Sequence, residues 1–301
     1  MYQGRIVKGI GGFYYVNTGI GLIECKPRGV FRKDSQIPLV GDKVLISLIE
    51  DNNAQGVIHE ILPRENMLPR PSVANVEQCV AVVATQQPQP DLLLLDRLLV
   101  LAHLNGMDKI ICFNKMDLDS EGKTREVIDA YRRVGYVVLC TSTKTGQGMN
   151  ELKEALRDRV SVFAGMSGVG KSSIMNTLQP GLGLKTGEVS SRLKRGRHTT
   201  RHAELLELNF GGMVVDTPGF SSLSLGAVKE LEDMEESEFG RFYPEFENSP
   251  GECRFAGCRH ISEPDCSVQI AVKEGNIAAF RYRNYIKLLE ELRQSRRKKY
   301  D

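Results

Sequence analysis

Hydrophobic and polar residues alternate along the first 67 residues, in short runs separated by glycines. The alternation predicts strands over residues 3–10, 13–17, 21–25, 43–49 and 56–61, because a period of two places every second side chain on one face. Five short strands in so few residues predict a small antiparallel barrel of the OB-fold type, which often holds RNA. The basic residues that could serve such binding are Lys8, Lys26, Arg28, Arg32 and Lys33. An SH3-like barrel used only for protein contacts is the alternative.

The pattern changes after residues 63–71, which carry three prolines and are expected to form a linker. Continuous apolar runs then alternate with stretches of helical period. The expected strands cover residues 78–85, 109–113, 136–140, 160–164, 203–208 and 213–216, and the expected helices 92–105, 123–134, 149–159 and 173–178. This alternation predicts a doubly wound parallel sheet. Residues 180–202 lack an apolar period and are expected to form a mobile loop.

A third pattern begins at residue 223, where acidic, helical segments lead to a cysteine cluster. Helices are expected over residues 267–274 and 276–297. The chain is therefore divided into a barrel (1–67), an α/β domain (72–222) and a helical, cysteine-containing domain (223–301).

The overall composition is that of a soluble globular protein, with 41% hydrophobic and 26% charged residues and a net charge of +2. No apolar stretch approaches the ~18 residues of a membrane span, and the first residues lack the apolar core of a secretion signal. The scattered cysteines Cys25, Cys79, Cys112 and Cys140 are expected to be small hydrophobic residues in a reducing cytoplasm.

The charges are unevenly distributed. Residues 191–201 hold five Lys and Arg and no acid, whereas residues 229–247 hold eight acids and two bases. The final residues add Arg293, Arg296, Arg297, Lys298 and Lys299. Such asymmetry suits a protein with one side facing nucleic acid, although solvated surface charge explains any single run equally well.

Residues 165–172 read G-x-x-x-x-G-K-S, between an expected strand and an expected helix. This is a P-loop, whose glycines turn backbone N–H groups onto phosphates at a helix N-terminus. Lys171 is expected to reach the β- and γ-phosphates, and the Ser172 hydroxyl to bind Mg²⁺. The expected nucleotide contacts in this loop are Gly165, Met166, Ser167, Gly168, Val169, Gly170, Lys171, Ser172 and Ser173.

The tetrapeptide Asn114, Lys115, Met116, Asp117 follows the expected strand 109–113. Such an N-K-x-D sequence predicts guanine recognition, because the Asp117 carboxylate accepts hydrogen bonds from guanine N1–H and its 2-amino group, which adenine lacks. Asn114 would brace the loops and Lys115 would pack along the base plane.

A second loop, beginning at Thr141 and Ser142 after strand 136–140, is placed to bind the base O6 through a backbone N–H. This signal is weak, because Ser-Thr turns are common.

Asp216-Thr-Pro-Gly219 follows the expected strand 213–216. Asp216 would hold Mg²⁺ through water, and the Gly219 N–H would meet the γ-phosphate. Thr199 or Thr200, in the basic loop before this segment, would complete the Mg²⁺ shell. The sequence leaves the choice between these two threonines open.

Along the chain, these motifs follow the order NKMD (114–117), TSTK (141–144), P-loop (165–172), threonine loop (199–200) and DTPG (216–219). In Ras-like proteins, by contrast, the segments that recognise guanine come last. This permuted order, with the barrel before it and the cysteines after it, resembles the circularly permuted small-subunit ribosome-assembly GTPases of the RsgA (YjeQ/YloQ) family. The resemblance covers essentially the whole chain. It implies a GTPase that binds the small ribosomal subunit and its rRNA late in assembly, with hydrolysis stimulated by the ribosome.

Cys253, Cys258, His260 and Cys266 have the spacing C-x₄-C-x-H-x₅-C. Three thiolates and one imidazole form a closed, structural zinc set, and the spacing matches the zinc motif of the family. Unlinked core cysteines are the alternative.

Phe220 follows Gly219, near where Ras-type enzymes carry a glutamine that positions water. Since phenylalanine cannot orient water, another group must do so, and His198 is the candidate because of its neighbouring threonines and its pKa range. The family resemblance points to the same loop histidine. The alternative is an ordinary surface histidine in a basic loop.

The sequence therefore predicts a cytoplasmic GTPase that uses GTP/GDP, Mg²⁺ and one structural Zn²⁺, and binds the small ribosomal subunit without a membrane partner. A monomer is expected, because no interface stripe is evident. The rival functions are a GTP-regulated switch and an RNA-binding module that are not tied to ribosome assembly.

Overall fold

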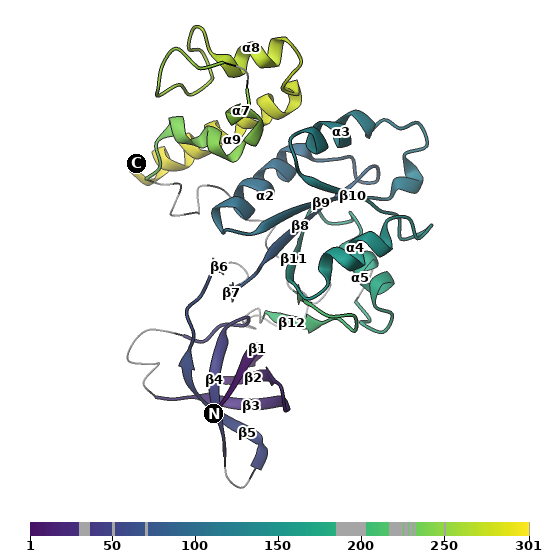
Figure 1. Cartoon of the computed structure of the whole chain (residues 1–301), viewed down its shortest axis with the longest axis vertical. Helices are drawn as coiled ribbons and strands as arrows, with labels where there is room; N and C mark the ends of the chain where they lie inside the picture. Colours follow the sequence, from purple (N-terminus) through teal and green to yellow (C-terminus); the bar gives the residue numbers. More distant parts are fainter. Residues whose placement is uncertain are drawn as a thin grey trace.

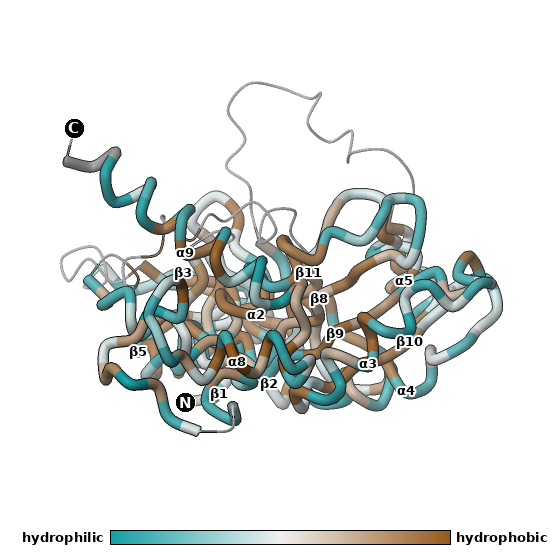
Figure 2. Tube along the Cα trace, turned by 90° about the horizontal axis from the view of Figure 1, so that it is seen from above, coloured by the Kyte–Doolittle hydropathy of each residue, from teal (hydrophilic) through white to brown (hydrophobic). Residues whose placement is uncertain are grey.

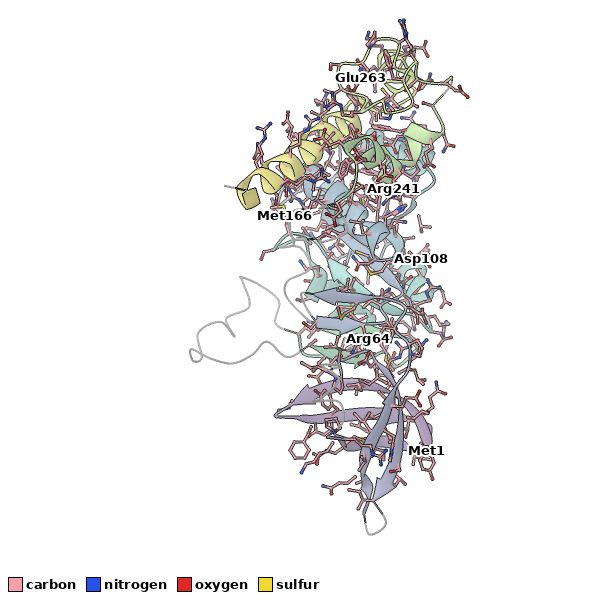
Figure 3. The ribbon with its side chains drawn as sticks, turned by 90° about the vertical axis from the view of Figure 1, so that its left-hand side faces the viewer. Met1, Arg64, Asp108, Met166, Arg241 and Glu263 are labelled. Carbon is pink, nitrogen blue, oxygen red and sulfur yellow. The ribbon has the colours of Figure 1, made fainter. Side chains whose placement is uncertain are left out.

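The structure, a computed structural model, describes residues 1–29, 37–49, 52–69, 72–184, 203–216, 225, 228, 231, 233–249 and 251–300. The molecule is elongated, with the N-terminal barrel, an α/β part and a C-terminal helical part stacked in that order (Figure 1). Met1 lies at the barrel end and Glu263 near the opposite end (Figure 3).

The predicted five-stranded barrel is confirmed, except that it is not wholly antiparallel, because its third and fifth strands run parallel. Its strands are β1 (Tyr2–Ile10), β2 (Phe13–Thr18), β3 (Gly21–Pro27), β4 (Lys43–Ile49) and β5 (Asn52–Ile61). They follow the order β1-β2-β3-β5-β4, and β1 also pairs with β4, which closes the barrel. The inward positions Ile6, Val16 and Ile46 are fully buried, as the alternating pattern requires.

The expected linker is more ordered than its prolines indicated. It contains a hairpin of β6 (Met67–Pro69) and β7 (Ser72–Ala74), in which Leu68 pairs with Val73 and both are fully buried. A Cβ on Gly41 would lie 1.9 Å from the Ala74 carbonyl oxygen. Only glycine permits this approach, so the hairpin packs directly on the barrel.

The predicted α/β fold is also confirmed, with strand order β10-β9-β8-β11-β13-β12. The strands are parallel except for the edge strand β12, which runs antiparallel to β13. The elements are β8 (Gln78–Ala84), α2 (Leu92–Leu104), β9 (Asp108–Asn114), η1 (Met116–Leu118), α3 (Arg125–Arg133), β10 (Val137–Cys140), α4 (Met149–Leu156), β11 (Val160–Ala164), α5 (Lys171–Leu178), β12 (Glu204–Glu207) and β13 (Met213–Asp216).

Strand β8 is buried along its whole length, because the sheet is covered on both faces. Cys79, Ala81 and Val83 belong to the core that includes α2 and α3. Val80 and Val82 belong to the separate core that includes α4 and α5. Figure 2 shows the hydrophobic colour gathered along β8, β9 and β11. This double burial explains the continuous apolar run in the sequence.

The barrel and the α/β sheet are joined edge to edge. Strand β12 pairs with β1 at Lys8 and Glu204, which gives one continuous eleven-stranded sheet. The Lys8 ammonium lies 2.9 Å from the Glu204 carboxylate, and Asn17 donates to Glu207 at 2.9 Å. Lys8, which the sequence offered as an RNA contact, is therefore paired within the molecule.

The C-terminal part consists of η5 (Glu236–Phe242), α7 (Pro244–Glu247), α8 (Ser267–Lys273) and α9 (Ala279–Tyr300). Its core is aromatic: Tyr243, Phe246 and Tyr285 pack with ring centroids 4.8–5.3 Å apart. Leu288 and Leu289 of α9 are fully buried. None of the helices among the described residues has the length and apolarity needed to cross a bilayer.

Candidate functional site

The P-loop lies at the carboxyl end of β11 and depends on two glycines. Gly165 has φ +144°, and a Cβ there would lie 2.2 Å from the Val82 carbonyl oxygen. Gly170 has φ +101°, and a Cβ there would lie 2.4 Å from the Asn114 amide nitrogen. Any side chain would push these segments apart, so both positions need glycine.

The remaining loop positions surround this turn. Ser167 and Gly168 are exposed, whereas Val169 is buried. Ser172 and Ser173 are half-buried in the first turn of α5, which presents its N-terminal N–H groups toward the loop.

Lys171 is held by its own loop. Its ammonium donates to the carbonyl oxygens of Gly165 at 2.7 Å and Met166 at 2.8 Å. Burial lowers the pKa of Lys171 from its ordinary 10.5 to about 8, because the ammonium loses hydration in the loop. The site thus holds a poorly solvated cation, which a phosphate can stabilise.

Asn114 connects the three loops that the sequence assigned to the nucleotide. It is 1% exposed at the end of β9. Its amide donates to the Val169 carbonyl oxygen in the P-loop at 2.9 Å, and its Oδ1 accepts from the Thr141 hydroxyl at 3.1 Å. The P-loop, the NKMD segment and the Thr141 loop therefore form one unit.

Asp117 is oriented by Ser142, whose hydroxyl donates to the carboxylate at 2.6 Å. Ser142 is fully buried, and Met116 bonds the Thr141 carbonyl oxygen through its backbone N–H at 3.1 Å. The sequence offered the Ser142 loop only for its backbone. The structure adds the side-chain contact, which fixes the orientation of the Asp117 carboxylate.

Lys115 spans the gap between the NKMD segment and the P-loop. Its backbone is left-handed with φ +64°, and its ammonium donates to the Gly168 carbonyl oxygen at 2.7 Å and to the Gln87 carbonyl oxygen. Thr85 donates to the Lys115 carbonyl oxygen at 2.7 Å. Sequence reasoning missed Thr85 and Gln87, and Gln87 contributes only a backbone atom, which leaves no residue signature.

Several predicted residues lie outside the described part of the chain: His198, Thr199, Thr200 and Gly219. For Asp216 only the backbone is described. It ends β13, and Val215 before it is in register with Val162 of the P-loop strand. The carboxyl end of β13 is thus next to the P-loop, as parallel neighbours require.

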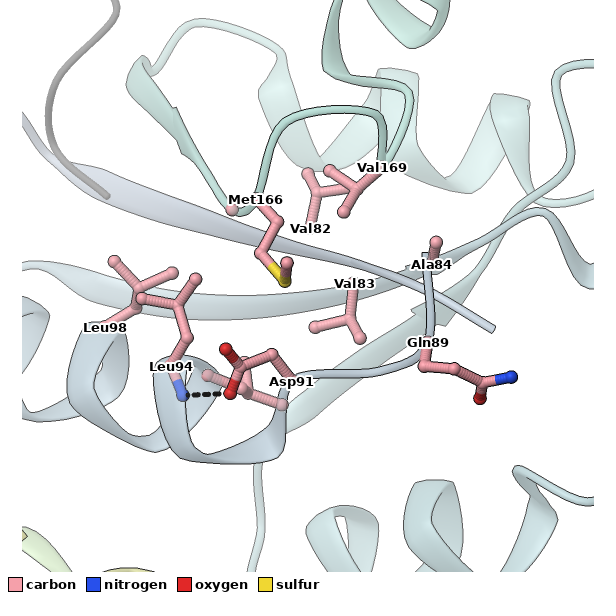
Figure 4. A pocket seen from close by; sticks show the side chains of 11 residues that line it. Val82, Val83, Ala84, Gln89, Asp91, Leu94, Leu98, Met166 and Val169 are labelled. Atoms are coloured by element: carbon pink, nitrogen blue, oxygen red, sulfur yellow. Dashed lines mark hydrogen bonds between the residues drawn. The ribbon is translucent and has the colours of Figure 1, made fainter. Parts of the chain in front are cut away.

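A small cavity of about 10 Å³ lies between the P-loop and α2. Met166 and Val169 border it from the loop, and Leu94 and Leu98 border it from the helix (Figure 4). Asp91 caps α2 here by accepting from the Leu94 N–H at 2.9 Å. The first turns of α2 and the loop that would hold phosphate therefore border the same cavity.

Cys253, Cys258, His260 and Cys266 converge, with their ligand atoms within 4.8 Å of one another. The Cys253 and Cys266 sulfurs are 3.9 Å apart, and His260 Nδ1 lies 3.6 Å and 3.4 Å from them. Tetrahedral zinc would give about 3.8 Å between sulfurs and about 3.6 Å between sulfur and nitrogen. The donor set and its spacing fit Zn²⁺.

The loop that carries this cluster is held by α9. Tyr282 donates to the His260 carbonyl oxygen at 2.6 Å, and Tyr285 donates to the Arg259 carbonyl oxygen at 2.7 Å. The Glu263 carboxylate accepts from the backbone N–H groups of Arg259 and Ile261 at 3.1 Å and 2.9 Å. These bonds fix the loop from two sides.

Two of the five C-terminal bases are engaged within the molecule, which revises their assignment to a nucleic-acid face. Arg293 forms two hydrogen bonds with Glu236, at 2.8 Å and 2.6 Å. Arg296 donates to the carbonyl oxygens of Leu231 and Met234, each at 2.5 Å. The acidic segment that the sequence set apart thus receives its counter-charge from α9.

Known proteins resemble this chain along its whole length. The RsgA GTPase family profile matches residues 61–226, and the RsgA N-terminal domain profile matches residues 3–58. A protein of Caldanaerobacter subterraneus subsp. tengcongensis, named small ribosomal subunit biogenesis GTPase RsgA, is 48% identical over 99% of this chain and 98% of its own. A protein of the same name from Alkaliphilus metalliredigens is 44% identical over 99% and 100%.

Two solved structures share the fold. The crystal structure of YjeQ from Thermotoga maritima superposes with a TM-score of 0.81 at 38% identity, covering 97% of this chain and 98% of that one. YloQ, described as a circularly permuted GTPase, gives a TM-score of 0.79 at 38% identity, covering 97% and 95%. The resemblance inferred from motif order is confirmed, and the chain belongs to the RsgA GTPase family of GTP-hydrolysing enzymes.

Proposed function

We propose that this chain is a GTPase that acts in the biogenesis of the small ribosomal subunit. The observation that carries the nucleotide assignment is the position of Asn114, which joins the P-loop to both guanine-recognition loops. The ribosomal assignment is supported by relatives that match end to end and carry that name.

In this proposal each segment of the site has one task. The P-loop backbone and Lys171 hold the phosphates of GTP or GDP, and Lys115 packs along the base. Asp117, oriented by Ser142, accepts from the guanine edge. The Gly219 N–H senses the γ-phosphate, so the chain just before the C-terminal part reports nucleotide state.

Magnesium would be held by Ser172, by Asp216 through water, and by Thr199 or Thr200. When bound, it neutralises the charge that develops on the β- and γ-phosphate oxygens. His198 is proposed to orient the attacking water, since Phe220 cannot do so.

Cys253, Cys258, His260 and Cys266 are proposed to bind one structural Zn²⁺. The ligand-atom spacing supports this assignment, and a Cys₃His set is typical of structural zinc sites.

The barrel and the zinc module are proposed to contact rRNA, and the protein to act as a cytoplasmic monomer. Lys26 and Arg28 remain candidates on the barrel. The exposed Lys26 lies over the half-buried Phe13 ring at 4.6 Å, and such a pair of cation and aromatic ring suits a nucleic-acid surface.

The test is GTP hydrolysis with and without purified small ribosomal subunits, at two salt concentrations. Stimulation of kcat by more than about tenfold, fading as salt rises, is expected, because phosphate contacts release counterions. Slow hydrolysis that ribosomal subunits leave unchanged would support the rival functions, a GTP-regulated switch or an RNA-binding module unrelated to assembly.

A further inference from the structure

Helix α2 borders the cavity under the P-loop at its start and contacts the C-terminal module a turn later. Asp96 lies between two of the leucines that line the cavity under the P-loop, Leu95 and Leu98, and is 1% exposed. Its Oδ1 accepts from the Tyr131 hydroxyl at 2.7 Å and from Arg281 of α9. Its Oδ2 accepts from the Asn284 amide of α9 at 2.8 Å.

Arg281 is the centre of this junction and is 1% exposed. Besides Asp96, it donates to both oxygens of Glu245, at 2.7 Å and 3.1 Å. Its guanidinium also lies over the rings of Tyr131 and Tyr243, at 5.0 Å and 4.5 Å. Separating α9 from α2 would leave the buried Asp96 carboxylate without its cation, so the two helices are expected to move together.

The same turn of α9 holds the loop of the cysteine cluster. Tyr282, next to Arg281, bonds the carbonyl oxygen of the ligand His260, and Tyr285 bonds that of Arg259. A path therefore runs from the P-loop, across the cavity that it shares with α2, and through α2 and α9 to the cluster.

At the nucleotide end of this path, Lys171 donates to the carbonyl oxygens of Gly165 and Met166. A bound phosphate draws the ammonium away from these acceptors. The Met166 side chain borders the leucines of α2 across a cavity of about 10 Å³, which is room for about one water molecule. A shift of the Met166 side chain into or out of this space would change the packing against Leu94 and Leu98 of α2.

We propose that the charged junction between α2 and α9 couples nucleotide occupancy of the P-loop to the position of α9 and its cysteine-cluster loop. The junction consists of Arg281 with Asp96, supported by Glu245 of α7, and of the Arg97–Glu291 pair. The coupling requires nucleotide binding but no ribosomal partner, so it goes beyond the proposed function. Because coupling is reciprocal, a variant that disrupts the junction must also change nucleotide affinity.

The test uses the full-length, zinc-loaded protein with and without GDP and Mg²⁺. Backbone hydrogen exchange in peptides covering residues 279–292 is measured in the wild type and in Arg281→Met. We expect GDP to slow exchange there in the wild type, and the difference to disappear in the variant. The GDP Kd of the variant should change on the order of fivefold or more.

Arg293→Met is the matched control. It removes an arginine from the same helix, but this arginine pairs with Glu236 of the C-terminal part itself. It should keep the GDP-dependent difference and a Kd within about twofold of the wild type. Glu291→Gln is a second variant. It removes the charge of Glu291, which pairs with Arg97 at 2.6 Å between α9 and α2. Because this pair is partly exposed to solvent, the change leaves no buried charge unpaired.

If Arg281→Met does not fold, Glu291→Gln decides, with a reduced GDP-dependent difference expected. The proposal is overturned if GDP leaves exchange in α9 of the wild type unchanged. It is also overturned if the folded junction variants keep the GDP-dependent difference in exchange of the wild type. An equal loss of this difference in Arg293→Met would overturn it as well.

Discussion

Raising the pH from 7.0 to 8.5 should weaken GDP binding through a single group, Lys171. Burial lowers the pKa of its ammonium to about 8 in the nucleotide-free loop. Bound phosphates raise this pKa again, because a nearby negative charge favours the protonated form. Binding therefore takes up a proton, so affinity is full below pH 8 and is lost as the pH rises above it.

The size of the effect follows from that pKa. The apparent Kd scales with 1 + 10^(pH − 8), a factor of about 1.1 at pH 7.0 and about 4 at pH 8.5. Proton uptake per GDP bound should be about 0.1 at pH 7.0 and about 0.5 at pH 8.0. The lowering of the Lys171 pKa from 10.5 to about 8 corresponds to a free energy of about 3 kcal/mol that disfavours the protonated side chain in this loop. A bound phosphate can offset that free energy.

Calorimetry at each pH, in two buffers with different ionisation enthalpies, measures this uptake directly. Ionisation of the terminal phosphate, with a pKa of about 6, releases protons instead and is nearly complete by pH 8. Lys171→Arg is the control, because a guanidinium stays protonated throughout and the uptake at pH 8.0 should vanish. Equal uptake in both proteins, or a Kd that does not change over this range, would refute the reasoning.

Four further changes test other parts of the site. Asp117→Asn should shift preference from GTP toward xanthosine triphosphate in competition binding, because xanthine presents an acceptor where guanine has its 2-amino donor. Gly170→Ala should raise the GDP Kd at least about tenfold, since its Cβ would meet Asn114. Cys258→Ala should lower bound zinc measured by mass spectrometry and lower Tm. His198→Ala should spare GTP affinity and reduce ribosome-stimulated turnover about 100-fold.

Controls separate these effects from general damage. Gly122→Ala also acts at a positive φ, +64°, but no heavy atom lies within 4 Å of the new Cβ. It should cost about 1–2 kcal/mol of stability and leave the GDP Kd unchanged. Cys79→Ala removes a buried thiol of β8 and should retain zinc. Retained zinc in Cys258→Ala, or unchanged turnover in His198→Ala, would contradict the assigned roles.

The sequence was most informative where one residue type is required by backbone geometry or by a ligand. The glycine spacing of the P-loop specified its turn, because Gly165 and Gly170 have no room for a Cβ. The alternation of the first 67 residues specified the barrel, because Ile6 and Val16 face a closed interior. The cysteine spacing specified the cluster, because few arrangements bring four such ligands together.

The sequence was less informative where a residue has several possible partners. Arg293 and Arg296 look like free cations in a basic terminus, yet they bind η5 and the chain before it. Lys8 pairs with Glu204, which is 196 positions away. The hairpin of β6 and β7 was hidden by prolines. Such contacts depend on which surfaces the fold brings together, and no local pattern encodes that.

The permuted motif order acquires a physical meaning from the sheet. The P-loop strand β11 is flanked by β8 on one side and β13 on the other. The chain enters the α/β part at β8 directly after the hairpin that packs on the barrel, and the sheet's last strand in the chain is β13. In the unpermuted order these two strands would lie in the interior of the domain's chain. Here β8 follows the barrel and β13 precedes the C-terminal part. A movement of either part therefore acts first on a strand that is hydrogen-bonded to the P-loop strand β11.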